Sequence, residues 1–124
     1  MSNNLDLLSM VQGLNASLTM GKPLSFSTGV VSASGDNTIL GAPVSFQNKI
    51  VFFQIQNESS VPTTVIIKFG ATAKYRILCQ NPGEGIVFIA PTGRTWDIGT
   101  VTLLALNLSG ANPVGYNFAY FNEA

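Results

Sequence analysis

The chain has 124 residues, enough for one domain built around one hydrophobic core. Lys and Arg number 6, and Asp and Glu number 6, so the formal net charge is zero and no basic surplus points to nucleic acid. Charged residues make up 10% of the chain, against roughly 25% in ordinary soluble domains, which favours a surface that meets other protein. No apolar run approaches the roughly 20 residues of a membrane span, so we expect no membrane partner.

The first part of the chain, residues 1–24, differs in pattern from the rest and is predicted to form an N-terminal arm. Apolar residues recur there at spacings of three, which predicts one short amphipathic helix, interrupted by Gly13 and Gly21 and ended by Pro23. A helix this short is marginal alone, so the alternatives are a frayed terminus or an arm that orders against a neighbouring subunit. We favour the second, because a frayed terminus would expose five apolar residues: Leu5, Leu7, Leu8, Val11 and Leu14.

Residues 25–124 alternate between apolar and polar positions, and clusters of Gly, Pro, Asn and Ser separate the alternating runs. Turn signals at intervals of about 8–12 residues predict roughly eight or nine short strands in an all-β sandwich or barrel. In chain order the strands are expected in "SFSTGVV", "TIL", "KIVFFQIQN", "TTVIIKF", "KYRILC", "IVFIA", the start at Thr95-Trp96, and the runs at 102–108 and 114–121.

The alternation also assigns side chains to faces. Phe26, Thr28 and Val30 share one face of their strand, while Lys74 and Arg76 point outward from theirs. Period-two positions in the three most apolar strands define the predicted core. Its inward-facing members are Val51, Phe53, Ile55, Val65, Ile67, Phe69, Leu104, Leu106 and Leu108.

The chain ends on two apolar runs, 102–108 and 114–121, which predict a β-hairpin with residues 109–113 as its connection. No charge occurs between Asp97 and Glu123, so both faces of this hairpin read as apolar. We expect one face to pack on the opposing sheet and the other on a second subunit, which places residues 101–121 at or near an oligomer interface. Three aromatic residues share one face of the last strand, through core packing or a subunit contact: Tyr116, Phe118 and Tyr120.

No constellation for catalysis, metal binding or cofactor binding is visible, so we expect no enzyme activity and no cofactor. Histidine is absent, and the single cysteine, Cys79, is expected to pack as a small hydrophobe in a protein folded in a reducing compartment. Acidic residues are dispersed, and neither a calcium loop nor a glycine-rich phosphate loop occurs. Trp96 is expected in the core or at its rim, with sugar stacking as the alternative.

Several segments follow one another in an order that resembles small β-sandwich (jelly-roll) proteins encoded in tailed-phage virion modules. The resemblance covers about residues 33–121 and is sharpest at "GDNT" (35–38) and at "ALNLS" (105–109) with Val114-Gly115 after it. It is weaker at "YRILCQNPGEG", where such proteins carry a plainer loop, and residues 1–24 have no counterpart. The segments are "ASGDNTILGAP", "KIVFFQIQNESS", "TTVIIKFGAT", "GIVFIAPTGRTWDIG" and "LLALNLSGANPVGYNFAYF".

The resemblance implies a single jelly-roll-like β-sandwich of antiparallel strands, residues 25–124, whose role lies in its surfaces. Such domains occur as capsid decoration (cement) proteins and in head or tail fibres, and the apolar arm favours decoration. We therefore expect a structural virion protein, made in the host cytoplasm, that bridges major capsid protein subunits on the capsid exterior as a homo-dimer or trimer. The alternative is a receptor- or glycan-binding module of a fibre. The expected contact residues are the five of the arm together with Tyr116, Phe118 and Tyr120.

Overall fold

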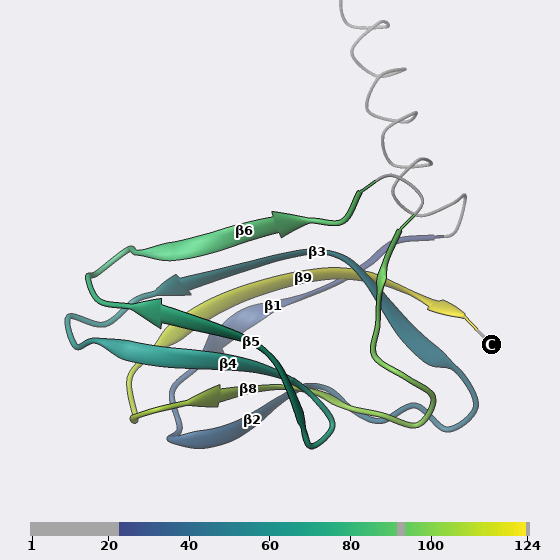
Figure 1. The fold of residues 1–124 in the computed structure, drawn as a ribbon, viewed down its shortest axis with the longest axis horizontal. Coiled ribbons are helices and arrows are strands. Elements are labelled where there is room, and N and C mark those ends of the chain that lie inside the picture. Colours follow the sequence, from purple (N-terminus) through teal and green to yellow (C-terminus); the bar gives the residue numbers. More distant parts are fainter. Residues whose placement is uncertain (1–22, 92–93, 124) are drawn as a thin grey trace, which may run out of the picture.

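The computed structural model describes residues 23–91 and 94–123, which form nine antiparallel strands in two packed sheets (Figure 1). The strand positions confirm the all-β prediction. The strands are β1 (Ser25–Val31), β2 (Gly35–Leu40), β3 (Gln47–Asn57), β4 (Thr63–Phe69), β5 (Thr72–Cys79), β6 (Gly85–Ile89), β7 (Trp96–Asp97), β8 (Leu104–Leu108) and β9 (Val114–Glu123). The turn "NPGEG" between β5 and β6 contains Gly83 at a positive φ of 77°.

The strand order is that of a jelly roll. Sheet A has the order β1-β9-β3-β6, with the short β7 paired to one end of β3, and sheet B has the order β2-β8-β4-β5. Apart from the β4–β5 hairpin and β6–β7, each connection between successive strands passes from one sheet to the other, so neighbours within a sheet are far apart in sequence. This double Greek-key arrangement confirms the predicted jelly-roll-like sandwich.

The predicted C-terminal hairpin is wrong, because β8 and β9 belong to different sheets. β8 lies between β2 and β4, and β9 lies between β1 and β3, so each is a central strand. The connection 109–113 crosses from sheet B to sheet A. A central strand of a sandwich has a neighbouring strand on each side, and the opposing sheet covers its inner face. This accounts for the apolar residues of β8 and β9 without a second subunit.

The inner faces of the two sheets form one core, largely as the alternation predicts. All nine predicted core residues are buried, and all except Val51 belong to the cluster between the sheets. Cys79 is part of the same cluster, which confirms that it packs as a small hydrophobe.

Val51 is buried, but on the outer side of sheet A, because a β-bulge interrupts the alternation of β3. Ile50 pairs with Tyr120 and Phe52 pairs with Ala119, which leaves Val51 as an additional residue in β3. Two residues opposite one shift the alternation by one position. Ile50 therefore takes the core position assigned to Val51, and Val51 packs with Ala119 and Phe121.

An aromatic cluster fills one end of the core around Phe53. Its ring centroid lies 5.2 Å from those of Phe88 and Trp96, 5.6 Å from that of Phe118 and 6.0 Å from that of Tyr75. Trp96 is half-buried against this cluster, which confirms its predicted position in the core or at its rim.

Replacing Phe53 with Ala should lower the free energy of unfolding by about 3–5 kcal/mol, because it removes the ring that the other aromatic side chains surround. Chemical denaturation measures the loss. Phe26→Ala is the matched control, since Phe26 is 62% exposed and its truncation should change stability by less than about 1 kcal/mol. Equal losses in the two variants would contradict the assignment of faces in sheet A.

Gly85→Ala should destabilise the edge of sheet A. A Cβ at this position would overlap the carbonyl oxygen of Ile55 and lie 2.8 Å from the Cα of Gln56, with which Gly85 pairs. Overpacking against backbone atoms costs about 1–3 kcal/mol, and thermal unfolding should show it. Gly41→Ala is the control, because no atom lies within 4 Å of a Cβ there. A Gly85→Ala protein as stable as Gly41→Ala would show that β6 is not held in this register.

Candidate binding surface

The outer face of sheet A is the surface most unlike that of an ordinary soluble domain. The pairing registers of β1, β9, β3 and β6 arrange its outward-facing residues in rows across the four strands. One row is apolar throughout, the next carries three polar side chains, and the third contains two glycines. In strand order the rows are Phe26, Ala119, Phe52 and Ile89; Thr28, Asn117, Gln54 and Val87; and Val30, Gly115, Gln56 and Gly85.

We call the first row and the residues beside it the apolar end of this face. A hollow of about 330 Å³ lies there, and Phe26 and Ile89 at its two sides are 62% and 59% exposed. The second, smaller apolar cluster, Val51, Ala119 and Phe121, is buried on this side of the sheet. The lining of the hollow consists of Leu24, Phe26, Val51, Phe52, Ile89, Asn117 and Ala119. An exposed apolar patch next to polar rows is typical of an interaction surface.

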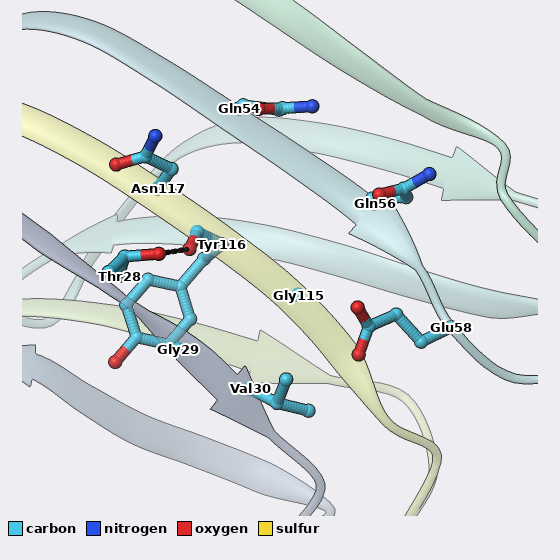
Figure 2. A pocket seen from close by; sticks show the side chains of 9 residues that line it. All are labelled: Thr28, Gly29, Val30, Gln54, Gln56, Glu58, Gly115, Tyr116 and Asn117. Atoms are coloured by element: carbon cyan, nitrogen blue, oxygen red, sulfur yellow. Dashed lines mark hydrogen bonds between the residues drawn. The ribbon is translucent and has the colours of Figure 1, made fainter.

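The second and third rows form the amide end, where a depression of about 340 Å³ lies (Figure 2). Gln54, Gln56 and Asn117 line it with carboxamide groups, each able to donate and accept hydrogen bonds. The Thr28 hydroxyl at its side donates to the carbonyl oxygen of Tyr116 at 3.1 Å. Glu58 is the one carboxylate in this lining. The chemistry of the amide end is therefore hydrogen bonding, by carboxamide groups and one carboxylate.

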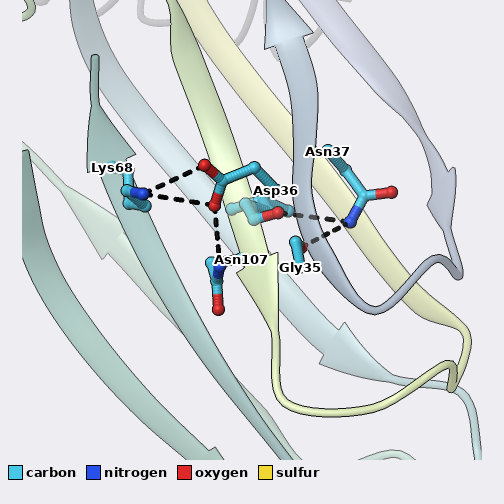
Figure 3. A network of polar contacts seen from close by, with 6 residues as sticks. Gly35, Asp36, Asn37, Lys68 and Asn107 are labelled. Atoms are coloured by element: carbon cyan, nitrogen blue, oxygen red, sulfur yellow. Dashed lines mark hydrogen bonds and ion pairs between the residues drawn. The ribbon is translucent and has the colours of Figure 1, made fainter. Parts of the chain in front are cut away.

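The outer face of sheet B is different, because charged groups pair on it (Figure 3). The Lys68 ammonium donates to both carboxylate oxygens of Asp36, at 3.0 and 3.2 Å, and the Asn107 amide donates to the same carboxylate at 2.7 Å. The hydrogen bond from Asn107 and then the one from Lys68 lower the pKa of Asp36. Paired charges of this kind are common on solvated protein surfaces. The outer face of sheet A differs, because apolar and amide side chains form its rows.

Ion pairs also occur at the far end of sheet A, beyond the apolar end. Lys49 lies 3.1 Å from Asp97 and 3.8 Å from Glu123. Burial raises the pKa of Asp97, but hydrogen bonds from Thr95 and Lys49 lower it by more, so the net shift is downward. The ion pairs of this sheet thus lie at one end, and Glu58 is the charged group beside the amide rows.

The predicted contact residues fall into two groups, and the structure describes one of them. Tyr116, Phe118 and Tyr120 face the core, where Phe118 is 1% exposed and the two tyrosines are half-buried. Core packing, one of the two alternatives, therefore accounts for this stripe, and Phe118 offers no surface to a partner. A contact through the exposed parts of the tyrosines stays a prediction. The other five residues, Leu5, Leu7, Leu8, Val11 and Leu14, lie outside the described residues.

The alternation in the sequence places Phe26 and Phe52 on faces of separate strands but does not join them with Ile89 into one patch. The sequence does predict that Phe26, Thr28 and Val30 share one face of their strand, and the structure confirms this. That face forms one side of the patch. Alternation within one strand does not show which strands become neighbours. The jelly-roll crossings bring β1, β9, β3 and β6 together.

The described part of the chain shows neither a cluster of metal ligands nor a cysteine with a lowered pKa. No group of three or more His, Cys, Asp or Glu gathers there in a way that would hold a metal ion. Burial raises the pKa of the Cys79 thiol, and nearby Glu84 raises it further, which disfavours the reactive thiolate. Within residues 23–91 and 94–123 there is also no helix long and apolar enough to cross a membrane.

Comparison with known proteins adds no family to this description. No model of a known protein family matches the chain, and no curated protein sequence matches it. A function therefore has to rest on the fold and on the surface chemistry of the described residues.

Acid should destabilise the protein partly through Asp36. Its folded-state pKa lies below that of the unfolded chain, so its contribution is present above the unfolded value, near 3.9, and is lost as pH falls through the folded value. Asp36→Asn should therefore flatten the loss of unfolding free energy at acid pH, by less than about 1 kcal/mol because the side chain is half exposed. Urea denaturation at neutral and acid pH measures the difference, and parallel curves for both proteins would contradict it.

Proposed function

We propose that this protein is a structural component of a phage virion that decorates and stabilises the capsid, attaching through the outer face of sheet A. The observation that carries the proposal is that face itself, where an exposed apolar row borders rows of uncharged amides. It agrees with the resemblance of residues 33–121 to jelly-roll virion proteins, whose role lies in surfaces.

The chemistry of the face suits a protein partner. The centres of protein interfaces are poor in charged residues and rich in aromatic ones, and the rows from Phe26 to Ile89 have this character. Both hollows are broad depressions on a sheet, whereas small-molecule sites enclose most of their ligand. The partner we propose is the major capsid protein, with the decoration protein on the capsid exterior as a small homo-oligomer, a dimer or trimer.

Stabilisation would follow from mass action. A protein that binds the assembled shell but not the separated subunits adds its binding free energy to the shell. A chain with zero formal net charge gains little from long-range electrostatic steering, so attachment depends on short-range burial. Attachment should accordingly change little with salt, unlike binding driven by charge. In this role the protein needs neither an enzymatic reaction nor nucleic acid contact.

A receptor- or glycan-binding module of a head or tail fibre is the second candidate, and the amide end favours it. Gln54, Gln56 and Asn117 present the donors and acceptors that sugar hydroxyls use. Sugar rings also stack on exposed aromatic faces, but Trp96 packs against Phe53, and the exposed Phe26 belongs to a continuous apolar row. Such a row suits a protein partner better than a sugar, so the decoration role is the better supported of the two.

Replacing Phe26 and Ile89 together with Ser should weaken attachment to purified capsids that lack the protein, roughly tenfold or more, because two exposed apolar side chains leave the contact. Co-sedimentation measures binding. Capsids carrying the variant should also release DNA at a lower temperature than capsids carrying the natural protein.

Leu78→Ser is the matched control, since Leu78 is 57% exposed on the outer face of sheet B and should not be part of the contact. Equal binding by both variants and the natural protein would contradict the assigned face. Glycan binding, together with antibody labelling at the tail tip alone, would favour the fibre role.

A further inference from the structure

We infer that the apolar end of sheet A is the docking site for the N-terminal segment, residues 1–22, of a second copy of this chain. The inference concerns the protein in solution and goes beyond the proposed function: the segment covers the apolar end of the free protein, and it has to leave this hollow before a capsid can contact Phe26 and Ile89. It rests on the dimensions of the apolar end, on the composition of the segment and on the point at which the chain enters the fold.

The apolar end has room for a short chain segment. From Phe26 on β1 to Ile89 on β6, the apolar row crosses three strand spacings, about 14 Å in all. Ala119 and Phe52 lie between them, and the buried cluster of Val51 and its neighbours lies beside the row. The result is a hollow with an apolar base and an exposed apolar residue at each side.

The segment matches this site in length and in charge. Residues 5–14 carry the five predicted contact residues of the arm, and as the short helix that their spacing predicts they would be about 15 Å long. Asp6 is the one charged side chain before Lys22. An amphipathic segment with a single charge, which its polar face can keep in water, and an apolar hollow of similar length can bury each other without desolvating ions.

The point of entry indicates that the segment comes from a second copy. Leu24 already packs on the cluster of Val51, Ala119 and Phe121, so the chain joins the fold at the rim of the hollow. Pro23 disfavours a helical conformation for the residue before it, so the helix that the sequence predicts ends before β1 begins. Residues 15–22, if extended, would reach up to about 27 Å further, far enough to bring residues 5–14 to an adjacent copy.

This patch alone is too small to hold two sandwiches together. Four strands and two rows cover a few hundred Å² at most, against about 800 Å² per partner in a stable interface. An exchanged segment adds contact area from both copies, and exchange of identical elements is a low-cost route to oligomers. The segment, more than the sheet face by itself, would hold the copies together.

Disulfide trapping between two variants tests the inference directly. One protein carries a cysteine in the segment, with Leu5→Cys, Leu8→Cys and Leu14→Cys made in turn, and the other carries Ile89→Cys at the side of the hollow. Mixed and oxidised, at least one pair should give a disulfide-linked heterodimer. The native Cys79 is buried and should not compete. Leu78→Cys in place of Ile89→Cys is the control and should give no specific product.

Light scattering completes the test on proteins without added cysteines. The full chain should form an oligomer that becomes monomeric when residues 1–22 are deleted, with unchanged circular dichroism of the sandwich. A monomeric full chain would overturn exchange between copies, and so would a protein carrying both Leu8→Cys and Ile89→Cys that closes a disulfide within one chain. An oligomer that survives the deletion would show that another surface holds it. None of these results depends on capsid attachment, so failure here is separate from failure of the decoration role.

Discussion

The pairing of β3 with β9 is the constraint on which the rest of the structure depends. It extends over ten residue pairs, from Gln47 opposite Glu123 to Asn57 opposite Val114, and it joins the two central strands of sheet A. Its register turns Phe53 and Phe118 toward sheet B and Phe52 and Ala119 away from it. The bulge at Val51 adds one more apolar residue to the outer side, so the same pairing produces both the core and the apolar end.

A buried side chain stabilises the end of this pairing at which Asn57 lies opposite Val114. Asn57 is fully buried, and its amide nitrogen donates to the carbonyl oxygens of Val61 and Asn81, while its amide oxygen accepts from the backbone N–H of Ser59. One side chain thereby links the connection after β3 to the turn before β6. Because a buried amide is expensive to leave unpaired, this corner stabilises the edge where β6 joins sheet A and forms one side of the binding surface.

The two outer faces show how one sandwich presents different surfaces. On sheet B, Asp36, Lys68 and Asn107 satisfy one another, so that face is solvated and offers little for a partner to bury. On sheet A, the carboxamides of Gln54 and Asn117 adjoin an exposed Phe26. Charged side chains are therefore scarcer on the outer face of sheet A than on the outer face of sheet B.

The sequence by itself determined the class of fold, the strands and most of the core, because alternation and turn residues act within a few positions of the chain. Residues such as Val65, Ile67 and Phe69 face inward wherever their strand pairs. The sequence could not show that the last two apolar runs separate into different sheets, that β3 contains a bulge, or that Phe26, Phe52 and Ile89 form one patch. Those features depend on which distant strands become neighbours, and only the crossings between the two sheets decide that.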